Sequence, residues 1–348
     1  MENNLKKIVF LLVFLQAFAG YGQNALKKYY KYTNKAELAI CAENYVQASR
    51  FYKKAFARHE PFGKDLSRAL LVNYKYTGNS KKALLYAHIL AQRNKFYPED
   101  WVTDTLQEQA FYFHLKNIRD TTRMVSIPEL QKAIQQIRED DQAVRRQCRD
   151  NSDSCRNFIL YTDSLNLVRI KALYKQYGFI SPARAGSVSG LYMSLLHNCQ
   201  LRYQDPHEIL IRDVMLGHYD ARDYMSLEDR CWCEVLDPLA GKPYKGYFGT
   251  NVYHATIVHN TLFVYEPINV KEVNRNRRKI HVYEKWEEYL VKLLFTFNEI
   301  NPDFNLVPLQ SFSFGSEENN KKEELSRIKE IEEGSVQGTY YTRLKKTK

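Results

Sequence analysis

The chain has 348 residues, a formal net charge of +11 and six cysteines. This length is enough for two modest domains, and no segment after the N-terminal region is long and apolar enough to span a bilayer. A basic balance in a cytoplasmic protein would favour nucleic acid as a partner. The N-terminal residues indicate export instead, so we expect no nucleic acid. Anionic envelope polymers or membrane surfaces are then candidate partners, and a basic surface without a partner is the default alternative.

Residues 1–23 are predicted to be a secretory signal peptide. Lys6 and Lys7 precede a short apolar run over residues 8–19, and small residues follow it. Signal peptides share this order of charged, apolar and small residues, and the run is shorter than the roughly 20 residues of a spanning helix. An uncleaved membrane anchor is the alternative. We therefore expect an exported protein, periplasmic or extracellular, with no membrane span after cleavage.

The cysteine pattern fits an oxidising compartment. Cys148 and Cys155 flank a polar, turn-like stretch between two predicted helices, which makes them the best candidates for a local disulfide. Cys231 and Cys233 are too close to bond each other comfortably. The chain has no C-x-x-C motif, which argues against a zinc ribbon or a thioredoxin-like site.

Residues 24–118 are predicted to form helical hairpins that resemble tetratricopeptide repeats. Similar residues recur about 35 positions apart. The corresponding pairs are Asn44 and Asn79, Ala48 and Ala83, Tyr52 and Ala87, and Ala55 and Leu90. The tryptophan of the first-helix signature is absent, so generic helical hairpins are the alternative. Stacked repeats form concave surfaces, and we expect an unknown protein or peptide partner to bind in such a groove.

Residues 119–312 are predicted to form a helical domain with one small β-hairpin, which makes the fold class mostly α. Helices are expected over about residues 128–148, 157–177, 188–202, 206–217, 221–231, 270–280 and 284–297. Ser126 and Glu129 form a capping-box pattern at the start of the first of these helices, and Gly178 is a natural C-terminal cap for the second.

The hairpin is expected at about residues 244–266. Thr, Val, Ile and Tyr become frequent there, and His259-Asn260 is suited to a two-residue turn. Residues 313–348 carry mixed charges and are predicted to be a flexible tail.

His197 is the first candidate for a catalytic residue. The apolar residues of its predicted helix fall on one face, and His197 lies roughly opposite to them. An imidazole in a cleft can act as acid, base or metal ligand. The alternative is a histidine packed against a neighbouring helix with both nitrogens hydrogen-bonded.

Asp229 and Arg230 are the next candidates. Adjacent residues on a helix point about 100° apart, so each needs another partner. Arg230 could clamp an anionic ligand, and Asp229 could orient His197 or a backbone amide. The alternative is an ion-pair network that ties the helix to the hairpin. Gln142 and Arg145, beside Asp141 on an earlier helix, are further candidates for ligand binding.

Tyr247, Gly249 and Thr250 enter the predicted hairpin and are candidates for ligand binding. Gly249 could let a ligand approach the backbone closely, or it could mark a β-bulge that aims the strand. The hairpin also contains His254 and His259, which lack further well-spaced ligands. We therefore predict no metal ion and no cofactor.

Asn274 and Arg277 belong to a basic run on a predicted helix. This run could capture an anion. Alternatively, it is a solvated face with one arginine folded back onto an acid such as Asp229.

The second half of the chain resembles a bacterial family of domains of unknown function. The order of its motifs carries the resemblance, over about residues 137–289. The motifs are Asp141-Gln142 with Arg145, Tyr177-Gly178, Leu196-His197, Glu228-Asp229-Arg230, Tyr247-Phe248-Gly249-Thr250, and Val273-Asn274 with Arg277-Arg278. Where the family commonly has Gly-Leu-Pro after its arginines, this chain has His281-Val282-Tyr283. The resemblance implies no activity.

Two functional hypotheses follow. In the first, the protein is an exported binding or protein-interaction module, with a repeat groove for a partner and a compact ligand-binding or scaffolding domain. In the second, it is a hydrolase-like envelope enzyme, with His197 as the base, Asp229 as its orienter, and Arg230 or Arg277 as the anion stabiliser. Convergence of His197, Asp229, Arg230 and Tyr247 on one solvent-reachable cleft would favour the enzyme.

Overall fold

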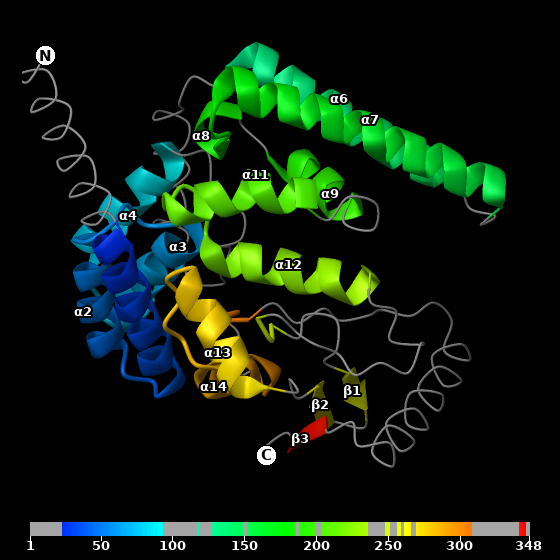
Figure 1. Ribbon diagram of the computed structural model, residues 1–348. Helices are drawn as coiled ribbons and strands as arrows, with labels where there is room; N and C mark the ends of the chain where they lie inside the picture. Colours follow the sequence, from blue (N-terminus) through cyan, green and yellow to red (C-terminus); the bar gives the residue numbers. More distant parts are fainter. Residues whose placement is uncertain are drawn as a thin grey trace, which may run out of the picture.

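The computed structural model is mostly helical (Figure 1). It describes residues 23–92, 117, 127–148, 152–185, 188–198, 204–235, 248–250, 256–258, 261–265, 269–298, 300–301, 303–307 and 341–345. Within these ranges, no helix has both the length and the apolar character needed to cross a membrane. The predicted signal peptide lies almost wholly outside them.

The front half, residues 23–92, consists of antiparallel helices. Residues 23–41 form the first helix, and it is followed by α2 (Tyr45–Phe56), α3 (Gly63–Leu71), the π-helix η1 (Val72–Tyr76) and α4 (Ser80–Gln92). Asn44 and Asn79 accept hydrogen bonds from the backbone N–H groups three residues later, each at 3.1 Å, so their side chains start α2 and α4. Ala48 and Ala83 are fully buried, which lets the helices approach closely.

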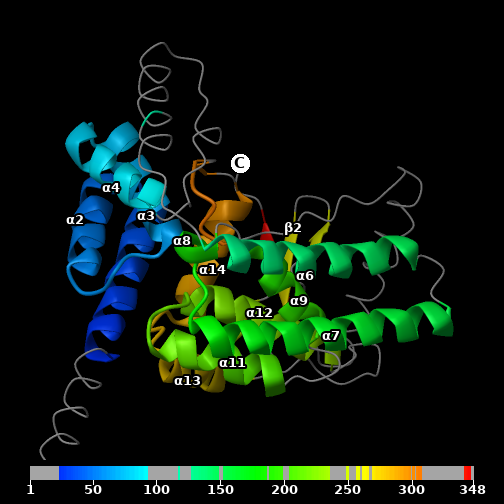
Figure 2. The same cartoon turned by 90° about the horizontal axis from the view of Figure 1, so that it is seen from above.

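The back half, residues 127–307, begins with a long antiparallel helix pair. The helices here are α6 (Pro128–Gln147), α7 (Asp153–Tyr177), α8 (Pro182–Ala185), α9 (Ser189–His197), α11 (Gln204–Met215) and α12 (Ala221–Val235). Seen from above, α6 and α7 extend beyond the other helices on the side opposite α2 and α4 (Figure 2). Gly178 ends α7 with φ +67°, in the left-handed region that favours glycine.

Two local predictions need correction. The residue that precedes α6 is Ile127, with no side-chain cap, so the predicted capping box of Ser126 does not start this helix. The predicted disulfide is absent, because Cys148 and Cys155 are not bonded to each other. Ser152 caps α7 by accepting a 3.2 Å hydrogen bond from the Cys155 N–H. This cap starts α7 at Asp153 and places Cys155 inside the helix instead of in the connecting turn.

A small antiparallel sheet and two helices complete the described fold. Strand β1 (Thr256–Val258) pairs with β2 (Thr261–Tyr265), and Ile257 lies opposite Leu262. The other edge of β2 pairs with β3 (Tyr341–Lys345). Of the predicted flexible tail, the structure describes only the residues of β3. The two helices are α13 (Val270–Lys279) and α14 (Trp286–Phe297).

The front and back halves share their hydrophobic cores. One cluster joins Leu26, Tyr29 and Tyr30 of the first helix to residues of α6 through α12. A second cluster packs Phe295 and Phe304 of the back half against α2, α3 and α4. The predicted domain boundary at residues 118 and 119 lies outside the described residues, and the two halves are packed together on either side of it.

Candidate functional site

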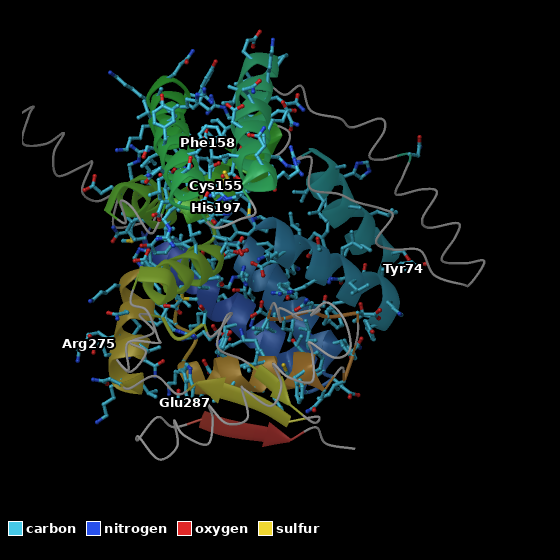
Figure 3. All side chains as sticks on the ribbon, turned by 90° about the vertical axis from the view of Figure 1, so that its right-hand side faces the viewer. Tyr74, Cys155, Phe158, His197, Arg275 and Glu287 are labelled. Carbon is cyan, nitrogen blue, oxygen red and sulfur yellow. The ribbon has the colours of Figure 1, made fainter. Side chains whose placement is uncertain are left out.

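Three helices bring four charged or titratable side chains together, which we call the His197 cluster. Asp141 and Arg145 lie one turn apart on α6, Asp163 comes from α7, and His197 ends α9. His197 Nδ1 lies 2.8 Å from Asp141 Oδ1. Arg145 joins the two acids, at 3.0 Å from Asp141 Oδ1 and at 2.9 Å from Asp163 Oδ2. The cluster therefore links α6, α7 and α9, and His197 is labelled beside them in Figure 3.

Burial divides the cluster into an inner and an outer part. The side chains of Asp141 and Asp163 are 1% and 3% exposed, whereas those of His197 and Arg145 are 17% and 24% exposed. Nδ1 of His197 is held by Asp141, and no described residue forms a hydrogen bond to Nε2. The imidazole is thus fixed on its inner side, and its side chain is partly exposed.

The two carboxyl groups are shifted in opposite directions. Burial alone would raise the pKa of Asp141, but the hydrogen bond and charge of His197, with help from Arg145 and Gln142, hold it below its ordinary value. Gln142 donates a 2.8 Å hydrogen bond to Asp141 Oδ2. Burial outweighs Arg145 at Asp163 and raises the pKa of that carboxyl group. Asp141 is therefore the ionised partner that orients the imidazole.

Asp141, Asp163 and His197 also form a set of metal-ligand types. One ligand atom from each lies within 4.8 Å of the others. However, the guanidinium of Arg145 bonds both carboxylates and already supplies the positive charge between them. A metal ion would have to displace Arg145, so the cluster as it stands is a closed ion-pair arrangement. Sequence reasoning did not include Asp163, because nothing near it in the chain marks it as part of a site.

Asp229 is placed differently from the expectation that it orients His197. Its side chain is buried and accepts hydrogen bonds from the Phe248 N–H at 2.7 Å, the Thr250 N–H at 2.6 Å and the Thr250 hydroxyl at 2.8 Å. Burial raises the pKa of Asp229 although these bonds oppose the rise. Asp229 and Thr250 therefore lock α12 to the segment after it, and the orienting role belongs to Asp141.

Arg277 is folded inward and has no free face for an anion. It is fully buried and donates from Nε to the Phe248 carbonyl at 2.7 Å and from Nη2 to the Gly249 carbonyl at 3.4 Å. Its Nη1 pairs with Glu284 at 3.1 Å. Gly249 has φ +64°, in the left-handed region that favours glycine, so the backbone conformation accounts for a glycine at this position. These contacts are structural and agree with the alternative of an arginine folded back onto an acid, which here is Glu284.

The remaining candidates that the structure describes do not join His197. The Asn274 side chain accepts a 2.8 Å hydrogen bond from the Trp286 N–H and so caps α14. The side chain of Arg230, and Tyr247, His254 and His259 entirely, lie outside the described residues. Among the candidates that can be placed, His197 shares a cluster with Gln142 and Arg145, whereas Asp229, Thr250 and Arg277 meet at a second, buried junction.

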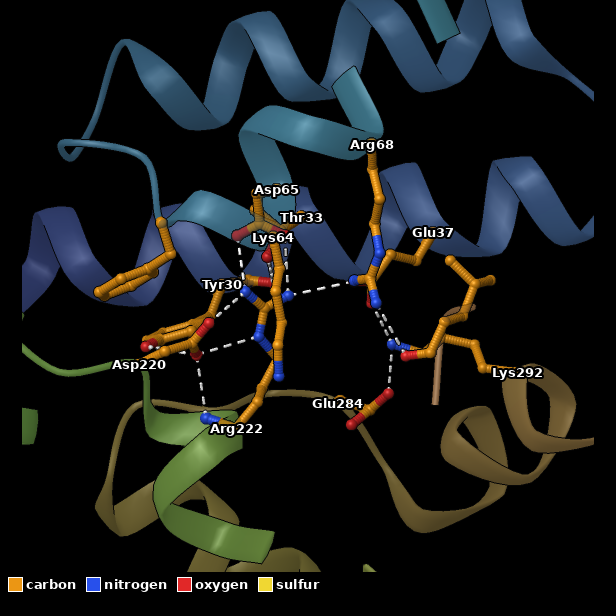
Figure 4. Close-up of polar contacts among 12 residues, drawn as sticks. Tyr30, Thr33, Glu37, Lys64, Asp65, Arg68, Asp220, Arg222, Glu284 and Lys292 are labelled. Atoms are coloured by element: carbon orange, nitrogen blue, oxygen red, sulfur yellow. Dashed lines mark hydrogen bonds and ion pairs between the residues drawn. The ribbon is translucent and has the colours of Figure 1, made fainter. Parts of the chain in front are cut away.

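Sequence reasoning missed a buried ion-pair network between the two halves (Figure 4). Its members are Glu37, Asp65, Arg68, Asp220, Arg222, Glu284 and Lys292. Glu37 pairs with Arg68, Arg222 and Lys292, and Lys292 also pairs with Glu284. The only signal in the sequence was a charge on the apolar side of a helix, such as Glu37 between Ala36 and Ile40.

Paired cations keep two acids of the network ionised. Burial would raise the pKa of Glu37, but Lys292, Arg68 and Arg222 lower it to about 2. Burial is likewise overcome at Asp220, where Arg222 lowers the pKa to about 2. Removing one charged member of such a network costs much free energy, because its former partners stay buried without a counter-charge. We assign it a structural role.

The network covers one face of the front half. Glu37 on the first helix and Asp65 and Arg68 on α3 point at α12 and α14. Arg68 also donates to the Asn305 carbonyl at 2.8 Å and to the Leu306 carbonyl at 3.1 Å. This face of the front half is therefore occupied by the protein's own back half.

Comparison with known proteins gives no relative. No family model matches the chain, and no curated protein and no solved structure is significantly similar to it.

Proposed function

We propose that the protein is an exported helical binding protein whose ligand site is the outer edge of the His197 cluster. The supporting observation is the arrangement of the imidazole, whose Nδ1 is held 2.8 Å from a buried carboxylate while Nε2 has no partner among the described residues. A fixed polar atom with a free lone pair or proton is suited to orienting a small polar ligand. The front half then acts as a scaffold for this site instead of a groove for a partner.

Binding is better supported than catalysis. A hydrolytic site needs a nucleophile or a positioned water, together with donors for a developing anion. The Ser194 hydroxyl is buried and lies 3.5 Å from Asp141 Oδ1, the same carboxylate atom that holds His197 Nδ1. Neither Asp229 nor Arg277 is available as an orienter or anion stabiliser. Binding requires only His197, Arg145 and the rigid helices beneath them.

The test is to observe the ring nitrogens of His197 by NMR while small probes are added. Acetate, inorganic phosphate and methylamine cover the simplest polar groups. We expect at least one probe to shift the His197 Nε2 signal in the wild type, and the binding to be lost in His197→Gln. His88→Gln, which removes an exposed histidine of α4, should bind like the wild type. Absence of any shift, or equal binding by His197→Gln, would contradict the proposal.

A hydrolase-like enzyme is the second candidate, and the Asp141–His197 hydrogen bond favours it. A buried carboxylate that fixes one ring nitrogen leaves the other free to act as a general base. In this version Asp141 takes the role first given to Asp229. Ester, amide and phosphodiester substrates should then be turned over with a pH dependence that His197→Gln removes. Activity that survives in His197→Gln would argue against it.

The proposal also includes export of the protein with cleavage of an N-terminal signal peptide. The N-terminal charges, apolar run and small residues support a cleaved signal peptide. N-terminal sequencing of protein recovered from the periplasm or medium should give a start between residues 20 and 24. An intact residue 1 in membranes would favour an anchor instead.

The front helices are proposed to be of tetratricopeptide type, and the back half to belong to the domain family of unknown function that it resembles. Cap residues Asn44 and Asn79, 35 positions apart, support the first assignment. The hydrogen bonds of Asp229 to the segment containing Thr250 support the second, because they join two motifs of that family. The short β1–β2 pair is proposed as the hairpin of this domain.

A further inference from the structure

The positive charge of the protein is concentrated in the front half. Residues 23–92 contain thirteen Lys and Arg against four Asp and Glu, so this segment carries a formal +9 of the chain's +11. Two of the four acids, Glu37 and Asp65, are buried in the ion-pair network. Only Glu43 and Glu60 are left as exposed acids of this segment. Because two of the four acids are buried, the residues of the front half that are not buried carry a larger positive excess than the formal charge of the segment.

Seven exposed cations of the first helix, α2 and the turn after α2 form a surface that we call the basic face. Its residues are Lys28, Lys31, Lys35, Arg50, Lys53, Lys54 and Arg58. Lys64, Lys75 and Arg68, elsewhere in the front half, are paired with Asp223, Asp303 and Glu37. None of the seven forms an ion pair with any described residue. Their charges are thus available to a partner.

The two helices present these cations on one continuous surface. On the first helix the spacing of Lys28, Lys31 and Lys35 places them on one helical face. Lys35 lies 5.7 Å and Lys54 lies 5.9 Å from the centre of the half-buried Phe51 ring, so the cations of the first helix meet those of α2 at this ring. Figures 1 and 2 both show α2 at the margin of the molecule, on the side away from α6 and α7.

We propose that the basic face binds the surface of an anionic phospholipid membrane. The headgroups offer a dense layer of phosphates, and each Lys or Arg held at such a surface strengthens binding by about five-fold. One feature favours lipid over nucleic acid. Phe51 lies among the cations and is only half-buried, as suits an aromatic residue at a membrane interface.

The test is co-sedimentation of the full chain, as the cell processes it, with lipid vesicles. Vesicles of phosphatidylcholine with about 30% phosphatidylglycerol are compared with pure phosphatidylcholine. We expect binding to the anionic vesicles only, and its loss as added salt shortens the reach of the charges. The variant Lys31→Glu/Lys35→Glu/Arg50→Glu should bind at least about 50-fold more weakly.

A matched control separates the basic face from net charge. Lys132→Glu/Arg146→Glu/Lys175→Glu changes three exposed cations of α6 and α7 and lowers the net charge by the same amount. We expect this control to bind like the wild type. Equal loss in both triple variants, or equal binding to neutral vesicles, would overturn the proposal. Binding to a single-stranded oligonucleotide with none to anionic vesicles would also overturn it, in favour of nucleic acid. Because all six substituted residues are exposed, circular dichroism should show folded variants.

Discussion

His281 is the residue whose conformation conflicts most with its type. It follows α13 with φ +68°, and the Val282 N–H bonds back to the Arg277 carbonyl at 2.9 Å, as in helices that end on a left-handed residue. Glycine is the usual residue there. The imidazole is also buried, and neither ring nitrogen has a hydrogen-bond partner among the described residues. The chain therefore bears both backbone strain and a desolvated polar ring at His281.

We predict that His281→Gly stabilises the protein by about 1 kcal/mol. Relief of the left-handed strain and of the unpaired buried nitrogens outweighs the extra flexibility of glycine in the unfolded chain. Urea unfolding at neutral pH measures the change. A loss of stability would show that packing of the ring outweighs its strain.

The advantage of His281→Gly should also grow as the pH falls. Burial, with the charge of Lys27, lowers the pKa of His281 below its ordinary value of 6.5. Below about pH 6.5 the unfolded chain then binds a proton that the folded protein does not, so the wild type loses stability. Glu43→Gly is the control, because Glu43 is exposed and has φ +53°. It should gain stability without this dependence on pH.

At the scale of single residues, the sequence did not predict which side chains lie next to one another. Gln142 and Arg145 both contact Asp141, and the acid that holds His197 is Asp141 instead of Asp229. Asp229 and Arg230 come next to each other in the chain, which gives no information on what packs against them. The partner of His197 lies 56 positions away, and only the packing of α9 on α6 brings it near.

At the scale of elements, periodicity located most helices to within a few residues. Helix α13 was expected over residues 270–280 and spans Val270–Lys279. Two ends differ more. Helix α7 starts at Asp153 instead of residue 157, because Ser152 caps it, and α9 ends at His197 instead of residue 202. The crossing of α6 and α9 was not predictable at all, since it depends on how closely two helices far apart in the chain can approach.

Gly190 sets that crossing, and we predict that Gly190→Ala destabilises the protein by about 1–3 kcal/mol. A Cβ atom at Gly190 would lie 2.6 Å from the Arg138 Cβ and 3.2 Å from the Ile134 carbonyl oxygen. Both are held by the body of α6, so α9 would have to move outward, at the cost typical of overpacking. Thermal or urea unfolding measures the loss.

The same change should loosen His197, which α9 also carries. The exposed Met193 of α9 provides the control, and Met193→Ala should change stability by less than about 0.5 kcal/mol. If Gly190→Ala leaves the stability unchanged, a Cβ atom at Gly190 does not force α9 away from Arg138, and the prediction is wrong.

At the scale of the whole molecule, the buried ion-pair network decides how the halves are coupled. Its charges come from the first helix, α3, α12, α14 and the segments next to them, and the shared hydrophobic clusters lie on either side. The sequence divided the chain at residue 118 because a polar, unpatterned link follows there. It could not reveal that charged side chains of one half also form buried pairs with those of the other.

We therefore expect Glu37→Gln to destabilise the whole protein by about 3–5 kcal/mol, because Arg68, Arg222 and Lys292 would remain buried with too little negative charge. Lys64→Gln, which breaks the exposed pair with Asp223, should cost less than about 1 kcal/mol. Circular dichroism and Trp fluorescence should report one shared unfolding transition in the wild type. Two separate transitions would contradict the coupling of the halves.

Unfolding measured at falling pH also tests the ion-pair network, because acid protonates the carboxylates that hold it together. The pKa values of Glu37 and Asp220 are lowered to about 2 from ordinary values of 4.5 and 3.8. A lowered carboxyl pKa stabilises the folded state above the ordinary value, and this stabilisation is lost as the pH falls towards the folded pKa. The wild type should therefore lose stability between about pH 4.5 and pH 2. Glu37→Gln starts from a lower stability and should lose less of it over this range, because the amide that replaces the carboxylate has no proton to bind. An equal acid loss in both proteins would mean that Glu37 is not held ionised by its three cations.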